Sequence, residues 1–207
     1  MLDEDVNNHM IKEKKKYLRN KILSLRSAQS EQTRRRESEQ VCKHLMDFYD
    51  EFKPQTVTAF VPFKDEIDIG PFVEQIRSRS QIYLPRVTKI RGERALIWGE
   101  LPAQGNDFPP RDWPVSNFGI SEPPVECCQS LVIPDLVIAP CVAVDRWGNR
   151  LGYGAGYYDK FLVKVEKSVP IIAVGYSCQM VTDELPHEAW DVPITGIITP
   201  SGYLELG

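Results

Sequence analysis

The residues best suited to chemistry gather in one stretch, Asp145–Asp159, which directly follows an apolar run at 136–140. Its glycines, Gly152, Gly154 and Gly156, permit positive φ angles and let main-chain N–H groups approach a ligand closely. The residues behind them predict the start of a helix. Because a strand that leads through a glycine-rich turn into a helix N-terminus forms a natural anion site, this stretch predicts binding of a phosphate.

Two charged side chains in the stretch suit such a ligand. Arg150 offers a planar fork of donors for phosphate or carboxylate, and Asp159 offers a carboxylate that could hold a metal ion. The spacing departs from the common glycine fingerprints, because G-x-G-x-x-G would need glycine where Tyr157 stands and the Gly-Lys-Ser/Thr of a P-loop is absent. The glycines alone are equally consistent with a tight turn that caps a helix.

The remaining pattern predicts the elements that position this loop. Apolar residues recur with helical period around 18–25 and again around 41–52, with Ser30 as a candidate N-cap between them. Strands are expected over 57–61, 81–87, 136–144, 171–176 and 194–199, and helices are expected to begin at Pro71 and to run from Tyr157 to about Lys167. This alternation predicts an α/β fold: a three-layer α/β/α arrangement around a mostly parallel, doubly wound (Rossmann-like) sheet.

Composition narrows the class of protein. The 207 residues, 42% of them hydrophobic, suffice for one core, so we expect a single domain over 1–207, with basic N-terminal helices over 12–52 and the order of residues 1–11 left open. The five cysteines show no C-x-x-C pair, which argues against a disulfide framework or a zinc site. No apolar leader and no run of about 20 apolar residues is visible. We therefore expect a cytoplasmic protein without a membrane partner.

The net charge of −4 is unevenly placed, because residues 12–36 contain ten Lys and Arg against two acids. Such an arm could steer a polyanion, whether nucleotide, polyglutamate or nucleic acid, or could merely form a solvated helix face. It lacks the interleaved aromatic residues expected of a single-strand binder, so we expect no nucleic-acid partner. No Ser/His/Asp or Cys/His arrangement is visible, which argues against a covalent hydrolase.

Read as a whole, Asp145–Asp159 meets the pattern D-x-x-G-x-R-L-G-x-G-x-G-[YF]-Y-D and thereby resembles the 5-formyltetrahydrofolate cyclo-ligase (5,10-methenyltetrahydrofolate synthetase) family. Four other segments resemble that family: Lys15-x-x-Leu18-Arg19, the E-I-D segment within Phe60–Ile69, the aromatic-G-I-x-E-P segment Phe118–Pro123, and the L-P-x-E-x-x-D-x-P segment Leu185–Pro193. The resemblance implies a fold related to the phosphosugar isomerase and CoA transferase-like group. It also implies ATP- and Mg²⁺-dependent conversion of 5-formyltetrahydrofolate to 5,10-methenyltetrahydrofolate, with release of ADP and phosphate.

The resemblance also assigns roles. Arg150 and Tyr157 would be catalytic. The ATP-binding residues would be Lys15, Arg19, Arg150, Leu151, Gly152, Tyr153, Gly154, Ala155, Gly156, Tyr157, Tyr158 and Asp159. The folate-binding residues would be Phe60, Glu66, Phe118, Tyr157 and Tyr158, and Asp159 and Asp191 would hold Mg²⁺. ATP would be a co-substrate, and we expect a monomer that acts on small molecules.

Some details stay open at this point. Lys14 or Lys16 could take the place of Lys15, and Arg86 could also face the ligand. Certain family members carry Lys where Ala155 stands and Arg where Tyr153 stands, so neither position supplies a phosphate cation here. Two alternatives are a noncatalytic nucleotide- or folate-binding module and a phosphosugar isomerase-like enzyme, which would need an acid/base pair that is not visible.

Overall fold

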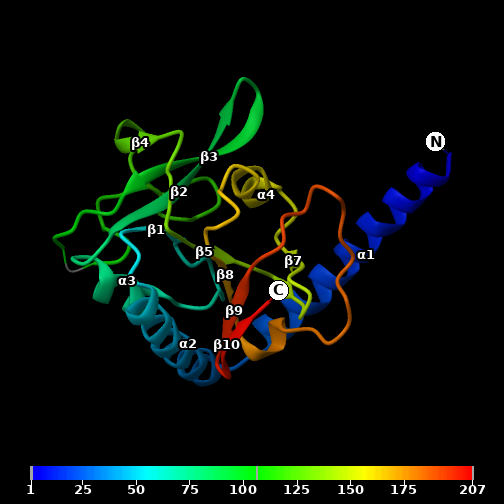
Figure 1. Cartoon of the computed structure of the whole chain (residues 1–207), viewed down its shortest axis with the longest axis horizontal. Helices are drawn as coiled ribbons and strands as arrows, with labels where there is room; N and C mark the ends of the chain where they lie inside the picture. Colours follow the sequence, from blue (N-terminus) through cyan, green and yellow to red (C-terminus); the bar gives the residue numbers. More distant parts are fainter. Residues whose placement is uncertain (1, 106, 207) are drawn as a thin grey trace.

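The computed structural model of the chain describes residues 2–105 and 107–206, with side chains from Asn8 onward. In these residues the central element is an eight-stranded sheet in the order β10-β9-β8-β5-β1-β2-β3-β4, and a second sheet pairs β6 with β7 (Figure 1). The strands are β1 (Thr56–Thr58), β2 (Gln81–Ile90), β3 (Glu93–Glu100), β4 (Cys128–Gln129), β5 (Leu136–Pro140), β6 (Ala143–Val144), β7 (Arg150–Leu151), β8 (Ile171–Val174), β9 (Gly196–Thr199) and β10 (Gly202–Glu205).

The middle of the large sheet is parallel. Strands β2, β1, β5, β8 and β9 run in one direction. At one edge β10 pairs antiparallel with β9, and at the other edge β3 pairs antiparallel with β2 and β4 pairs antiparallel with β3. The predicted mostly parallel α/β sheet is thus confirmed. The prediction missed the edge strands β4 and β10, since a two-residue strand and a largely exposed one carry little periodic signal.

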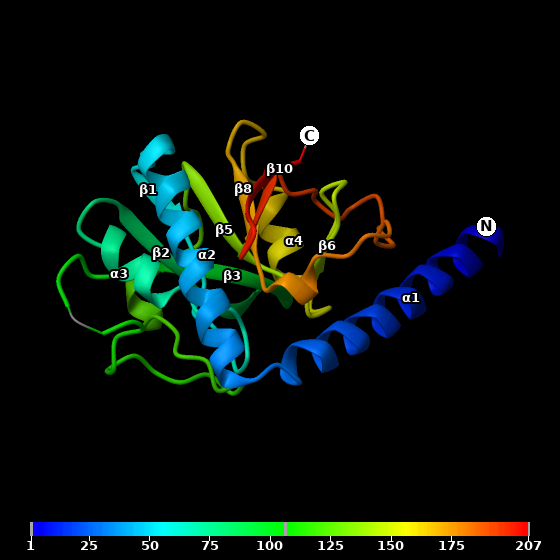
Figure 2. The same cartoon turned by 90° about the horizontal axis from the view of Figure 1, so that it is seen from below.

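Helices cover both faces of the sheet (Figure 2). They are α1 (Leu2–Ser27), α2 (Glu31–Phe52), α3 (Gly70–Ile76) and α4 (Tyr157–Leu162). Strand β5 shows why: Leu136 and Ile138 pack in the cluster that contains α2 and α3, and Val137 and Ala139 pack in the cluster that contains α4. Because successive side chains of a strand point to opposite faces, an apolar strand of this kind needs cover on both sides.

The two N-terminal helices were predicted, and the junction between them is capped as expected. The Ser30 hydroxyl accepts a hydrogen bond from the Thr33 N–H at 3.1 Å, and α2 ends at Lys53, which adopts a left-handed conformation with φ of 53°. The backbone of residues 2–11 is helical and forms the first part of α1, and Met1 lies outside the described residues.

Several predicted boundaries are wrong. Helix α4 ends at Leu162 rather than near Lys167, because the chain closes there with tight turns, the first of them from the Lys164 N–H to the Phe161 carbonyl. The strand predicted over 57–61 is only three residues long, and the one predicted over 136–144 is divided between β5 and β6. After both β1 and β5 the apolar run continues as buried loop, which periodicity does not distinguish from strand.

This topology brings the functional segments together. Strands β1 and β5 are parallel neighbours, so the segments that follow their carboxyl ends meet at one edge of the sheet. The segment after β1 carries Glu66, and the segment after β5 carries the glycine loop 152–156. None of the helices in the described part of the chain combines the length and apolar composition that a membrane span requires.

The Ser30 cap supports a stability prediction. Replacing Ser30 with Ala should lower the free energy of unfolding by about 1 kcal/mol, because the Thr33 N–H loses its acceptor at an exposed helix start. Urea denaturation of Ser30→Ala and of Ser27→Ala measures this. Ser27 is the control, since its exposed hydroxyl bonds only to carbonyls of its own helix. Equal stability of both variants and the parent protein would contradict a stabilising cap.

Candidate active site

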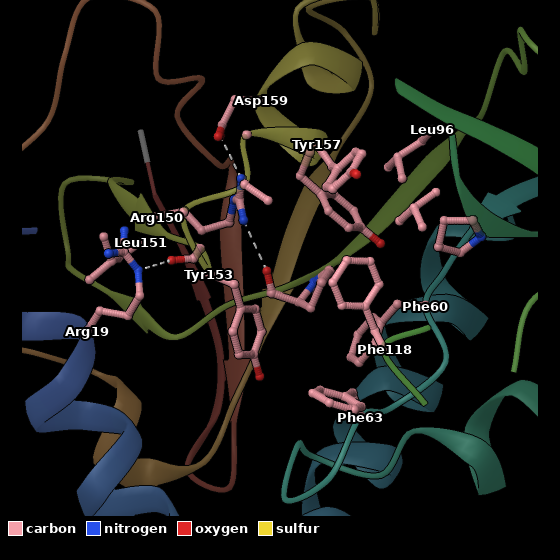
Figure 3. A pocket seen from close by; sticks show the side chains of 18 of the residues that line it. Arg19, Phe60, Phe63, Leu96, Phe118, Arg150, Leu151, Tyr153, Tyr157 and Asp159 are labelled. Carbon is pink, nitrogen blue, oxygen red and sulfur yellow. Dashed lines mark hydrogen bonds and ion pairs between the residues drawn. The ribbon is translucent and has the colours of Figure 1, made fainter. Parts of the chain in front are cut away.

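A cleft of about 600 Å³ opens at the carboxyl ends of the parallel strands (Figure 3). Every residue to which the family resemblance assigned a role lines it, from Lys15 and Arg19 on α1, through Phe60, Glu66 and Phe118, to the whole of 150–159 and Asp191. The lining also includes residues that were not predicted: Lys12, Val61, Phe63, Pro85, Val87, Leu96, Ile120, Glu122, Pro140, Glu188 and Trp190. All these residues line one cavity, which has the glycine loop at one end and Glu66 with apolar side chains at the other.

The glycine loop is shaped by a buried carboxylate. Asp145 is fully buried and accepts hydrogen bonds from the N–H groups of Trp147, Asn149 and Leu185 at 2.7 to 2.9 Å. Its two oxygens therefore join the glycine loop to the C-terminal segment that carries Asp191. These contacts give Asp145, which the sequence pattern contained without a role, the structural role of a buried acceptor.

Two of the three loop glycines have the predicted backbone. Gly154 and Gly156 have φ angles of 91° and 73°, in the region that side chains rarely adopt. Gly152 does not have positive φ, which corrects the prediction for it. Glycine at 152 leaves room instead for Arg150, because a Cβ there would lie 3.1 Å from the arginine Nη1.

Arg150 is fixed at the base of the cleft. Its side chain is 3% exposed, and its Nη2 donates to Asp159 Oδ1 at 2.7 Å while Nη1 donates to the Pro140 carbonyl at 3.2 Å. The guanidinium also lies over the Tyr158 ring, 5.6 Å from its centroid. Its Nε and the buried Tyr158 hydroxyl have no partner among the described residues. The predicted phosphate cation and the predicted metal ligand are thus directly paired.

Helix α1 contributes one face to the cleft. Lys15 Nζ donates to Glu188 Oε2 at 2.8 Å and to the Asp191 carboxylate, and Arg19 Nε donates to the Gly152 carbonyl at 2.8 Å. Lys14 and Lys16 are exposed and do not line the cleft. The register is therefore the predicted one, with the residues at i and i+4 on the same face.

The same face continues to the other end of the cleft. Arg26, eleven residues after Lys15, is 2% exposed, and its Nη2 donates to Asp65 Oδ1 at 2.8 Å and to the Tyr153 hydroxyl at 2.7 Å. Glu66 Oε2 accepts a hydrogen bond from the Phe63 N–H at 2.8 Å. Arg26 was not predicted, although the spacing of Lys15, Arg19 and Arg26 on one helix was the available signal.

The pKa values of the neighbouring acids Glu66 and Asp65 are shifted in opposite directions. Burial raises the pKa of Glu66 above its usual value, against the opposing effect of a hydrogen bond from Tyr153. For Asp65, burial also acts upward, but the hydrogen bond and charge of Arg26 outweigh it and lower the pKa. Burial, and next the negative charge of Glu66, raise the pKa of Tyr153, so this hydroxyl stays a donor.

Aromatic and aliphatic side chains form the walls at this end. Phe60, Phe63 and Phe118 lie on one side, and Tyr157 of α4 points toward them from the other (Figure 3). Phe118 is 59% exposed, so its ring is available to a ligand rather than packed in the core. The cleft therefore offers an apolar slot that ends on the half-buried Glu66 carboxylate.

Arg86, whose direction the sequence left open, does not line the cleft. Its Nη1 donates to the Pro123 carbonyl at 2.9 Å and lies 3.8 Å from Glu122 Oε2. The reason is strand parity: Pro85 and Val87, on either side of it in β2, point into the cleft, so Arg86 points away. Glu122, 3% exposed, lines the cleft in its place.

The carboxylates of the cleft are suited to a hard cation such as Mg²⁺ only if a bound ligand supplies further oxygen atoms. Among the described residues no group of three or more His, Cys, Asp or Glu is arranged to hold a metal ion. Asp159 and Asp191 nevertheless line the cleft, and Glu188 has one buried oxygen without a hydrogen-bond partner. Magnesium is commonly held by one or two carboxylates plus substrate phosphates and water, so this donor set fits Mg²⁺ brought with a nucleotide.

The family model for 5-formyltetrahydrofolate cyclo-ligase matches residues 11–200. The chain belongs to the 5-formyltetrahydrofolate cyclo-ligase family. It is 29% identical to the 5-formyltetrahydrofolate cyclo-ligase of Escherichia coli K12 over 189 residues, which is 89% of this chain and 99% of the relative. The corresponding enzyme of Mycolicibacterium smegmatis is 32% identical over 90% of this chain and 93% of its own length. The predicted family and its enzyme class, ligase, are thereby confirmed.

Solved structures agree with the cyclo-ligase assignment. The Aquifex aeolicus 5,10-methenyltetrahydrofolate synthetase superposes with a TM-score of 0.76 at 32% identity, covering 93% of this chain and 92% of that one. The Mycoplasma pneumoniae 5,10-methenyltetrahydrofolate synthetase gives a TM-score of 0.67 at 23% identity over 90% and 98%, which supports the fold.

The raised pKa of Glu66 generates a prediction about stability. In the ligand-free protein, Glu66→Gln should raise the free energy of unfolding at pH 7, because the neutral amide removes the cost of burying a charge. An acid whose folded pKa is raised imposes this cost above its unfolded pKa and loses it on protonation. The gain should therefore shrink toward pH 4, near the usual Glu value of about 4.3.

Urea denaturation of the parent protein and of Glu66→Gln at the two pH values measures the effect. Glu74→Gln on α3 is the control, since Glu74 is exposed. A variant that is less stable than the parent at pH 7 would show that the hydrogen bonds of the carboxylate outweigh its desolvation.

Proposed function

We propose that this chain converts 5-formyltetrahydrofolate to 5,10-methenyltetrahydrofolate with ATP and Mg²⁺, releasing ADP and phosphate, and that residues 1–207 act as one domain. The observation that carries the proposal is the cleft itself. One cavity joins a glycine loop with Arg150 to an apolar slot that ends on the Glu66 carboxylate. A nucleotide triphosphate and a pterin need these two environments side by side.

The triphosphate would lie at the glycine loop. Lys15, Arg19, Arg150 and the main-chain N–H groups of 152–156 supply positive charge there. Before the nucleotide arrives, Lys15 is paired with Glu188 and Asp191, and Arg150 with Asp159, whereas Arg19 donates to the Gly152 carbonyl. When bound, Mg²⁺ would neutralise phosphate oxygens, and Asp159 and Asp191 are the residues that would hold it.

The folate would occupy the apolar end. A carboxylate such as Glu66 presents two acceptors to adjacent ring N–H and amino groups of a pterin, and its partial burial makes that pairing selective. Phe60 and Phe118 would pack against the ring system, and Tyr157 and Tyr158 would orient the formyl group. Tyr158 supports this role, because its buried hydroxyl has no protein partner among the described residues.

We propose that the cleft then acts by position and charge. The formyl oxygen attacks the γ-phosphorus of ATP and ADP leaves, which gives a phosphorylated imine. N10 adds to the former formyl carbon and loses its proton, and phosphate departs with the former formyl oxygen. Arg150 stabilises the transferring phosphoryl group, and Tyr157 holds the formyl group in line with it. This sequence requires no general base from the protein.

We also propose a cytoplasmic monomer that acts on small molecules, without a nucleic-acid or membrane partner. The support for a monomer is that one chain supplies both ends of the cleft. The support against a nucleic-acid role is that Lys15, Arg19 and Arg26, the inner face of the basic arm, contact the cleft or its supporting residues.

The proposal predicts an ATP-dependent rise in the near-ultraviolet absorbance of the methenyl product when the protein is mixed with 5-formyltetrahydrofolate, Mg²⁺ and ATP. Omission of ATP is the control, and it should give a flat trace. A flat trace with ATP present, for protein that binds ATP in a separate titration, would contradict the proposal and favour a binding module.

The site assignments predict two different kinetic defects. Asp159→Asn should lower kcat on the order of 100-fold while the folate still binds, because a charge that acts during phosphoryl transfer is lost. Arg150→Ala should raise the KM for ATP more than the KM for folate. Arg146→Ala is the control, since Arg146 lies over the Trp147 ring and does not line the cleft. Unchanged ATP kinetics in Arg150→Ala would remove Arg150 from the phosphate site.

A further inference from the structure

A chain of hydrogen bonds leads from the buried Arg26 to the carboxylate of Glu66. Arg26 Nη2 donates to the Tyr153 hydroxyl at 2.7 Å, and the Tyr153 side chain in turn hydrogen-bonds Glu66. The same carboxylate accepts a hydrogen bond from the Phe63 N–H at 2.8 Å. Arg26 and Glu66 also line one narrow gap that borders the cleft. Side chains from α1, the glycine loop and the segment after β1 therefore meet at this carboxylate.

The chemistry of the donors fixes the direction of each hydrogen bond in this chain. A guanidinium carries only donors, so the oxygen of Tyr153 is the acceptor in its contact with Arg26. The Tyr153 hydroxyl therefore keeps its own hydrogen for Glu66. Because the Phe63 N–H is also a donor, Glu66 accepts at both contacts, and about two of its roughly four acceptor positions stay available for a ligand. Hydrogen bonds donated to a carboxylate favour its ionised form.

The Tyr153 side chain is directed toward the Glu66 end of the cleft, although its backbone belongs to the glycine loop. Its hydroxyl points away from Arg150 and Asp159 (Figure 3). Tyr153 is 42% exposed and lines the cleft, and the Arg26 guanidinium lies 5.6 Å from the centroid of its ring. The ring thus borders the cleft while the hydroxyl is held between a cation and a carboxylate.

The neighbours of Glu66 keep a fixed charge near neutral pH. The charged or titratable groups that face it are Arg26 from α1, Asp65 in its own segment, Tyr153 from the glycine loop, Tyr158 from α4 and Cys141 after β5. Burial acts upward on the pKa of Asp65, but the hydrogen bond from Arg26 outweighs it and lowers the pKa. Burial raises the pKa of both tyrosines and raises that of Cys141 to about 12. For Glu66, burial raises the pKa, and the hydrogen bond from Tyr153 and the charge of Arg26 oppose this.

We propose that Arg26 and Tyr153 are positioning residues, which keep the Glu66 carboxylate ionised and oriented for the ring N–H and amino group of the folate. This inference rests on the proposed function, which pairs the pterin with Glu66. A protonated Glu66 would present a hydroxyl to a donor of the pterin, so one hydrogen bond of the pair would be lost. Both residues act through Glu66 and not on the reacting atoms.

Tyr153→Phe tests the inference, because it removes only the hydroxyl. The measurement is equilibrium binding of 5-formyltetrahydrofolate without ATP from pH 5 to 8, followed by the fluorescence of tryptophan, since Trp190 lines the cleft. The affinity of the parent protein should fall as Glu66 becomes protonated at low pH. In Tyr153→Phe the fall should begin about one pH unit higher, because one hydrogen bond to the charged form is lost. Arg26→Gln should move the fall in the same direction, in protein whose cooperative unfolding by urea confirms the fold.

Tyr176→Phe is the matched control. The Tyr176 hydroxyl donates to the main-chain carbonyl of Glu66 at 3.0 Å, so the same group is removed beside the same residue but not from its carboxylate. This variant should keep the pH profile of the parent protein. An unchanged profile in Tyr153→Phe, or an equal displacement in Tyr176→Phe, would overturn the positioning role. Absence of turnover in a parent protein that binds the folate would contradict the proposed function alone, because the binding measurement needs no ATP.

Discussion

The structure of the cleft depends on how one face of α1 is held against the rest of the chain. Lys15, Arg19, Ile22 and Arg26 recur at the i, i+4, i+7 and i+11 positions of this helix and all face inward. Ile22 supplies the apolar contact, with 4% of its surface exposed. Arg19, about one turn before Ile22, reaches the glycine loop, and Arg26, about one turn after Ile22, reaches the loop after β1. A single helix therefore contacts both the glycine-loop end and the Glu66 end of the cleft.

The burial of Arg26 makes this docking specific. A guanidinium that is 2% exposed is tolerated because Asp65 and Tyr153 satisfy part of its donor set. Removing one member of such a buried pair typically costs about 3 to 5 kcal/mol, which is a large fraction of the stability of a domain. The Tyr153 side chain in turn hydrogen-bonds Glu66, so the position of Arg26 also affects that carboxylate. A displacement of α1 would thus disturb both substrates in the proposed reaction.

Much of this arrangement could be predicted from the sequence. The alternation of strands and helices indicated a mostly parallel α/β sheet. The family motifs also identified residues, such as Arg150 and Asp159, that the structure brings into one cleft. Their roles in catalysis, ATP binding, folate binding and metal binding stay predictions. The family assignment is confirmed by the comparison with known proteins.

Other features could not be predicted, because they depend on contacts between distant segments. The direction of Arg86 follows from the parity of β2, which the sequence does not fix to a face. The early end of α4 at Leu162 and the edge strand β10 are set by what packs beside them rather than by local propensity. Arg26 contacts residues 39 and 127 positions away along the chain, so its helical spacing from Lys15 and Arg19 could place it on the same face but could not name its partners.

The central claim is that one cleft holds both substrates, with α1 spanning them. A crystal structure with Mg²⁺, a non-hydrolysable ATP analogue and 5-formyltetrahydrofolate tests this most directly. The expected result is a triphosphate against residues 152–156, with Lys15 moved from Asp191 to the phosphates and the pterin paired with Glu66. A nucleotide bound outside this cleft, or a pterin that does not contact Glu66, would contradict the claim.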